Sequence, residues 1–109
     1  MITAKRLVGG SALTGALATY YTVPAATVTI IKEFVLCNTD SAARTIDAHV
    51  IPSAGSAVVA NQIFQDLTLQ AGETKIFSLS QVLPAGSFLQ ASASVAAVVS
   101  MNVSGVEIT

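Results

Sequence analysis

Asp47 and His49 are the two side chains of this chain best placed for acid–base chemistry. They are two residues apart in the alternating segment Arg44–Ile51, so both should point to one face of a strand. A carboxylate beside an imidazole is a familiar arrangement for a general base. The solvated outer face of a strand has the same pattern. We favour that second interpretation, because no nucleophile motif accompanies the pair.

The other carboxylates also lack the spacing of a catalytic or metal site. Asp66, Glu73 and Glu107 could meet in space as a carboxylate pair or a cation site, but we favour solvated edge charges, and a metal site needs three or four ligands. The chain has no GxSxG motif, and Gly9-Gly10 is too short for a phosphate-binding loop. We therefore expect no catalytic residues, no metal, no cofactor and no enzymatic activity.

Charge is scarce and unevenly distributed. Charged side chains make up 10% of the chain, against about 25% in an ordinary globular protein. Residues 7–31 and 76–106 carry none, yet both runs are too polar and too interrupted to span a membrane. The net charge of −1 offers no attraction for nucleic acid. Uncharged surfaces predict contacts with other protein subunits, and we expect neither a membrane nor a nucleic-acid partner.

Cys37 is the only cysteine, so an intrachain disulfide is excluded. Its neighbours Val35 and Leu36 predict a buried, inert thiol. The first ten residues contain a basic pair without a continuous apolar stretch, so a signal peptide is not expected.

Short runs of β-branched and aromatic residues, separated by turn residues, predict an all-β fold. We expect strands at Thr19–Val23, Thr27–Asn38, Arg44–Ile51, the second half of 58–70, Glu73–Leu79, Ser87–Ser94 and Ala97–Ile108. Residues Ser80–Pro84 should form a brief helical turn. This spacing, without an amphipathic helix, predicts a single β-sandwich, and both jelly-roll and immunoglobulin-like connectivities remain open.

The two ends of the chain carry the weakest strand signals. Glycine, serine and alanine dominate residues 1–16, where Gly9-Gly10-Ser11 should interrupt a strand beyond Ile2–Val8. We therefore expect a flexible N-terminal arm over residues 1–16, dispensable for folding, and a β-sandwich domain over 17–109. In the last strand, the apolar residues from position 99 on occupy odd-numbered positions before Gly105 and even-numbered positions after it, which is a change of parity. This predicts a β-bulge there, or a strand whose other face is buried against a neighbour.

Lys5, Arg6, Tyr20 and Tyr21 are the candidate interface residues. The two basic side chains could pair with acidic groups on a partner. Of two adjacent tyrosines in one strand, one should face outward, where an aromatic ring is a good anchor for an interface. The four phenylalanines lie in apolar-patterned strands and should belong to the core.

Several short motifs follow one another in an ordered series. They are Tyr21–Ala25, Thr29–Lys32, Val35–Thr39, Val50–Ser53, Asn61–Ile63, Leu69–Thr74, Val82–Gly86, Ala91–Ala93 and Ser104–Ile108. The series resembles that of small structural proteins of tailed-phage virions, and it covers about residues 20–109. The resemblance implies a non-enzymatic β-sandwich on or in a phage particle. It transfers no functional residue, because its motifs are turns and core positions.

From this resemblance and the uncharged surfaces we expect a capsid decoration (cement) protein. It would bind the major capsid protein or neighbouring virion proteins, form a homo-oligomer, and reach the virion after synthesis in the host cytoplasm. A tail, fibre or collar component is the alternative. A carbohydrate-binding module is a more remote one.

Overall fold

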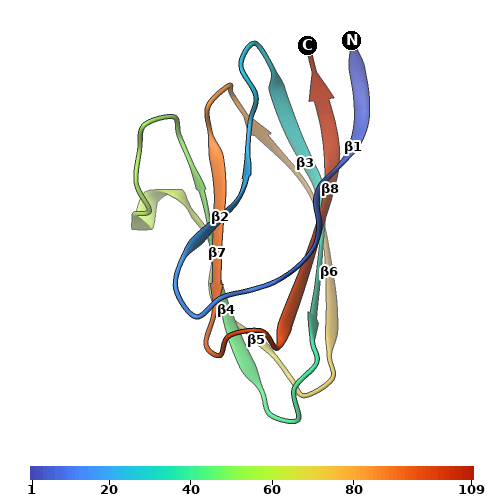
Figure 1. The fold of residues 1–109 in the computed structure, drawn as a ribbon, viewed down its shortest axis with the longest axis vertical. Coiled ribbons are helices and arrows are strands. Elements are labelled where there is room, and N and C mark those ends of the chain that lie inside the picture. Colours follow the sequence, from blue (N-terminus) through green and yellow to red (C-terminus); the bar gives the residue numbers. More distant parts are fainter.

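The computed structural model describes all residues, 1–109, and consists almost entirely of β-strands (Figure 1). The strands are β1 (Ile2–Ala12), β2 (Ala18–Thr22), β3 (Val28–Asn38), β4 (Arg44–Ile51), β5 (Gln62–Leu69), β6 (Thr74–Leu83), β7 (Phe88–Ala93) and β8 (Val99–Ile108). One short 3-10 helix, η1 (Val59–Asn61), precedes β5. None of the helical structure has the length and apolarity needed to cross a membrane.

The strands form two four-stranded antiparallel sheets that stack as a sandwich, and consecutive strands lie in different sheets except for β4 and β5 (Figure 1). One sheet has the order β1-β8-β3-β6 and the other β2-β7-β4-β5. Strand β1 pairs with β8, β2 with β7, β3 with β6, and β4 with β5. These four pairs are the arrangement of one long hairpin of eight strands that has been rolled up, which is a jelly roll. The predicted β-sandwich is confirmed, and its connectivity is jelly-roll rather than immunoglobulin-like.

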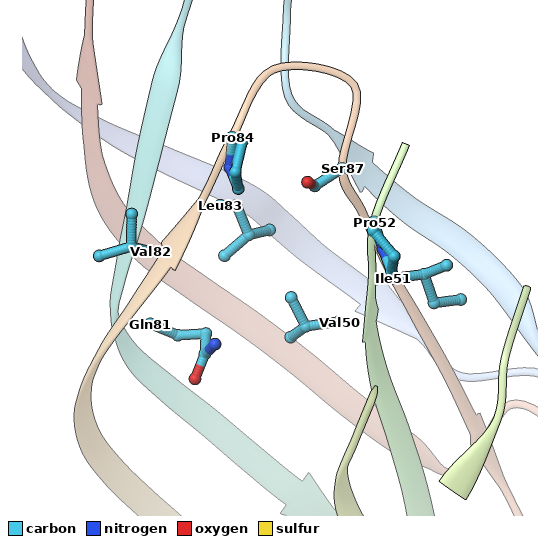
Figure 2. A pocket seen from close by; sticks show the side chains of 8 residues that line it. All are labelled: Val50, Ile51, Pro52, Gln81, Val82, Leu83, Pro84 and Ser87. Carbon is cyan, nitrogen blue, oxygen red and sulfur yellow. The ribbon is translucent and has the colours of Figure 1, made fainter. Parts of the chain in front are cut away.

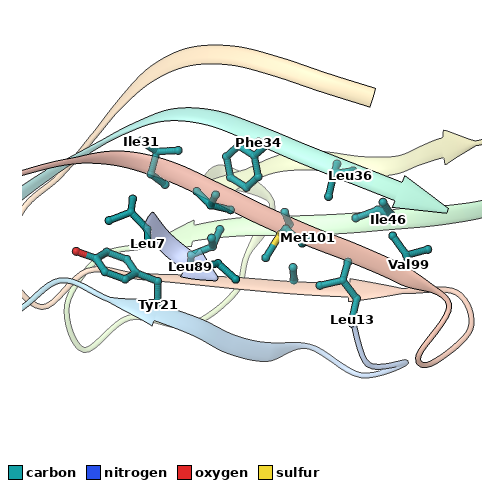
Figure 3. Packing of buried hydrophobic residues seen from close by; sticks show 14 of the residues in the cluster. Leu7, Leu13, Tyr21, Ile31, Phe34, Leu36, Ile46, Leu89, Val99 and Met101 are labelled. Carbon is teal, nitrogen blue, oxygen red and sulfur yellow. The ribbon is translucent and has the colours of Figure 1, made fainter. Parts of the chain in front are cut away.

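The core lies between the two sheets and is built from side chains that alternate along each strand (Figure 3). In β8, Val99, Met101 and Val103 point inward and are almost fully buried. Phe34 of β3 is fully buried, and its ring meets that of Phe64 edge to face at a centroid distance of 5.4 Å. Core positions therefore come from both arms of the rolled hairpin.

Residues 1–16 do not form the flexible arm that their composition predicts. Residues 2–12 are strand β1, which is paired with β8 from Ile2–Ile108 to Ala12–Ser100. The glycines do not end the strand, because the register shifts between Val8 and Ser11 absorb them. Leu7, Val8 and Leu13 are buried in the core. The expected division at residue 17 therefore falls between two strands of one sandwich.

Other expected elements differ from the structure in smaller ways. The helical turn predicted at Ser80–Pro84 is wrong, because β6 continues as a strand to Leu83. The bulge predicted at Gly105 lies instead on the neighbouring strand β3, where the register shifts between Ile31 and Glu33. Cys37 is half-buried on the outer side of its sheet rather than buried.

Asn38 joins two turns at the end of the sandwich opposite the termini. Its side chain is fully buried, and Nδ2 lies 2.9 Å from the carbonyl oxygen of Ala42, 3.2 Å from that of Leu69 and 3.1 Å from that of Gln70. Its Oδ1 accepts a hydrogen bond from the Asp40 amide at 3.0 Å. One amide side chain thus connects the β3–β4 turn to the end of β5.

We expect Asn38→Ala to lower the free energy of unfolding by at least about 3 kcal/mol, because several buried backbone groups lose their partner. The measurement is the denaturant midpoint of each purified variant. Asn102→Ala is the matched control: Asn102 is half-exposed on the outer side of β8, and we expect a change within about 0.5 kcal/mol. Equal effects of the two substitutions would contradict this assignment.

Candidate interaction surface

Asp47 and His49, the pair that could have carried acid–base chemistry, have different hydrogen-bond partners in the structure. His49 is only 7% exposed, and its Nδ1 lies 2.8 Å from Oδ1 of Asn61. Oδ1 of Asp47 accepts a hydrogen bond from the Asp66 amide at 2.9 Å and one from Gln62 at 3.4 Å. The expected solvated face is therefore wrong for His49, which joins β4 to the residue that ends η1. Both side chains have structural partners, and neither orients the other.

Asp66, Glu73 and Glu107 remain apart in the fold. The structure contains no group of three or more histidine, cysteine, aspartate or glutamate side chains that could hold a metal ion. Glu73 caps a turn by accepting a hydrogen bond from the Gln70 amide at 2.8 Å. The Glu73 carboxylate thus has a local structural role.

Two of the candidate interface residues, Lys5 and Tyr21, meet Glu107 near the termini. Lys5 forms an ion pair with Oε1 of Glu107 at 3.2 Å, and the Tyr21 hydroxyl donates to Oε2 at 2.5 Å. The Tyr21 hydroxyl also lies 2.7 Å from Oγ1 of Thr29. Burial first, and then the bond to Glu107, raise the pKa of Tyr21 to about 12. The Tyr21 hydrogen bond is the main cause that holds the pKa of Glu107 below its usual value.

This polar cluster changes the expected roles of the four interface candidates. Tyr21 is 9% exposed and belongs to the core, so its ring is not free to anchor a partner (Figure 3). Tyr20 is half-buried against the core, and its hydroxyl accepts a hydrogen bond from the Thr14 amide at 3.1 Å. Arg6 is exposed and forms no ion pair. Of the four, Arg6 alone presents an unengaged group to solvent.

A larger feature lies on the outer face of the β1-β8-β3-β6 sheet, at the end that carries both termini (Figure 1). There, directly opposed residues on the four strands are all apolar. One row is Ile2, Ile108 and Val28, and the next is Ala4, Val106, Ile30 and Val82. We call these seven residues the apolar patch.

The apolar patch faces solvent. Ile2 is 72% exposed and Val82 56% exposed, while the β8 members, Val106 and Ile108, are half-exposed. Strand β8 keeps its alternation through Gly105, so its last apolar residues fall on the side opposite the core. The parity change in the sequence is therefore the signal for this patch. Strand β8 stays within one sheet, and burial of its outer apolar face against a neighbour stays a prediction.

A shallow hollow of about 180 Å³ lies beside Val82 (Figure 2). It is lined by Val50, Ile51, Pro52, Gln81, Val82, Leu83, Pro84 and Ser87. The lining contains no charged or nucleophilic pair, since its polar side chains are one amide and one hydroxyl. The hollow thus adds uncharged surface next to the apolar patch and does not supply a catalytic site.

A domain with this fold belongs to the architectural class of eight-stranded jelly rolls, which virus capsid, lectin and cupin domains share. Neither a protein-family model nor a curated protein matches the chain. The structural similarities below therefore bear on the fold.

Solved structures with a similar fold come from infectious bursal disease virus. The VP2 subviral particle gives a TM-score of 0.56 with 17% identity, covering 98% of this chain and 32% of that chain. A chain of the T13 viral particle gives 0.58 with 11% identity, covering 99% and 31%. The Gt strain gives 0.53 with 13% identity, covering 98% and 32%. The chain thus spans about a third of each of these proteins, and the similarity establishes a shared fold.

Proposed function

We propose that the chain is a non-enzymatic structural component of a virus particle, which acts by binding neighbouring protein subunits. The observation that carries this proposal is the apolar patch, a charge-free outer sheet face that water alone covers in the isolated chain. Exposed, contiguous apolar surfaces mark protein interaction sites. The shared fold with proteins of icosahedral virus particles supports the same class of role.

Within this class, a capsid decoration protein remains our first hypothesis and a tail, fibre or collar component the second. The tailed-phage origin rests on the sequence resemblance alone. The carbohydrate-binding hypothesis loses the support of an exposed tyrosine, because Tyr21 is buried and the hydroxyl of Tyr20 is engaged. The partner expected at the apolar patch is the major capsid protein or another virion protein, with an apolar surface of its own.

The test replaces Val106, in the middle of the apolar patch, with lysine. Val106→Lys should fold, because the residue lies on the outer face and a long side chain can extend its charge into water. We expect at least about a tenfold loss of the chain from virions, because the charge would be desolvated at the interface. The measurement is quantitative mass spectrometry of purified virions, as a ratio to the major capsid protein.

Ser104→Lys is the matched control, because Ser104 is exposed on the same face of β8, two residues away and outside the apolar patch. Its incorporation should equal that of the unchanged chain. A ratio near one, or a simple large fraction, indicates shell decoration, whereas a few to some dozens of copies indicate the tail or collar. Absence of the unchanged chain from virions would refute the proposal.

A further inference from the structure

The free edge of β6 differs from the other three sheet edges in how little it is protected against pairing with another chain. Strands β1 and β6 border one sheet, and β2 and β5 border the other. An edge strand exposes unpaired backbone N–H and C=O groups, to which another chain can add a strand. Proteins protect such edges with bulges, charges, short strands or distorted backbone.

Three of the four edges carry such protection. Strand β1 contains two register shifts, the charged pair Lys5 and Arg6, and Gly10 with φ of 80°. Strand β2 has only five residues and one register shift. In β5, the exposed charged residue Asp66 has φ of 47°, and the ladder with β4 contains two register shifts.

Strand β6 carries fewer of these devices: it has one register shift, where Leu79 and Ser80 lie opposite the single residue Lys32 of β3. It has ten residues, and from Ile76 to Leu83 it contains no charge, no glycine and no proline. None of its residues has a positive φ. Its side chains nevertheless alternate between the inner and outer faces through that shift. The side of β6 away from β3 has no strand partner.

The outward side chains of β6 are complementary to themselves. They are Ile76, Ser78, Ser80 and Val82, which read apolar, hydroxyl, hydroxyl, apolar in both directions. If two copies pair antiparallel with Leu79 opposite Leu79, Ile76 of one copy faces Val82 of the other. Ser78 then faces Ser80. The two apolar side chains, 63% and 56% exposed in the isolated chain, would cover each other.

We propose that β6 is a self-association edge, through which two copies of this chain pair antiparallel about a two-fold axis at Leu79. The β1-β8-β3-β6 sheet of one copy and the same sheet of the other then form one continuous eight-stranded sheet, held by about six to eight new backbone hydrogen bonds. A two-fold contact uses the same surface on both copies, which the palindromic pattern of β6 satisfies. The contact is smaller than the about 800 Å² per partner of a standard interface, so we expect a dissociation constant in the micromolar range. This pairing is independent of a role in a virus particle.

Disulfide trapping tests the register directly. In a Cys37→Ser background, a Ser78→Cys chain is mixed with a Ser80→Cys chain and oxidised mildly. In the proposed pairing these residues are opposite, with Cα atoms about 4.5–5.5 Å apart, which lies within the range that a disulfide spans. We expect the mixture to crosslink at least about fivefold faster than either variant alone, whose cysteines are offset by two residues at about 7–8 Å.

Sedimentation equilibrium of the uncrosslinked chain supplies the second measurement. Ser78→Lys should fold, because Ser78 is exposed and lies opposite Glu33 of β3, and it should weaken the dimer at least about tenfold. Gln65→Lys, on the exposed edge strand β5, is the matched control and should leave the dimer unchanged. A monomer at about 0.5 mM would overturn the proposal, since that concentration is far above a micromolar dissociation constant. A dimer that is unaffected by Ser78→Lys and does not crosslink in this register would also overturn the proposal. The same holds if the β6 edge binds only a different protein and not a second copy of this chain.

Discussion

Deletion of residues 2–12 is expected to leave a chain that does not fold. These residues are strand β1, which is paired with β8 over its length and supplies Leu7 and Val8 to the core. Burying two such side chains contributes about 3–6 kcal/mol, against a total stability of about 5–15 kcal/mol for a domain of this size. The lost ladder hydrogen bonds and the newly exposed edge of β8 add to the loss.

Circular dichroism during a thermal scan measures this effect. The full chain should show a cooperative transition, and the truncated chain should show none. Adding a synthetic peptide of residues 2–13 should restore the transition, because an extended peptide can complete a sheet at a vacant edge. Removal of Met1 alone, which is 84% exposed, is the control and should leave the transition in place. A truncated chain that melts within a few degrees of the full chain would show that residues 1–16 act as an arm after all.

The sequence predicted the strands that are rich in β-branched residues and bounded by turn residues. Arg44–Ile51 is β4 to the residue, and Thr27–Asn38 differs from β3 by one position. The alternation of burial breaks at Lys32–Glu33 in β3 and at Ala48–His49 in β4, but Pro52 or the turn after Asn38 still ends the strand. Local pattern is sufficient here for the strand bounds, because strand propensity and turn residues agree with the fold.

The errors occur where pairing or packing with distant residues decides the conformation. Gly9 and Gly10 suggest a break, but the ladder with β8 carries the chain through them. His49 occupies an outward position on β4, yet the segment that leads to Asn61 covers it. Neither the ladder with β8 nor the contact of His49 with Asn61 can be predicted from the residues that are adjacent in the sequence. A strand partner about 90 positions away cannot be read from local periodicity.

The sequence predicts part of the apolar patch. Val106 and Ile108 indicate it, because their positions in the alternation place them on the side of β8 that otherwise carries polar side chains. The other members come from β1, β3 and β6, and only the register of the assembled sheet places them in two rows. The charge-free run 76–106 therefore has two physical explanations, since it contains core strands as well as outward positions in the apolar patch and the β6 edge.

Gly105→Ala is expected to be the most damaging single substitution in the sheet. Residue 105 faces inward on β8, where the irregular part of β3 comes closest. An added Cβ would overlap the carbonyl oxygen of Ile30 and lie 3.0 Å from Cδ1 of Leu7. A backbone carbonyl in a central ladder cannot rotate away as a side chain can. We therefore expect a loss of at least about 4 kcal/mol in the free energy of unfolding, measured by urea denaturation.

Gly15→Ala is the matched control, because a Cβ at Gly15 would meet nothing within 4 Å and the backbone there needs no positive φ. We expect that substitution to be neutral or to stabilise the chain by up to about 1 kcal/mol, through the lower entropy of the unfolded state. If Gly105→Ala and Gly15→Ala unfold at the same urea concentration, β3 does not approach β8 as closely as the structure has it. The presence of glycine at position 105 would then have to be explained by a requirement of folding or by the partner that covers Val106 and Ile108.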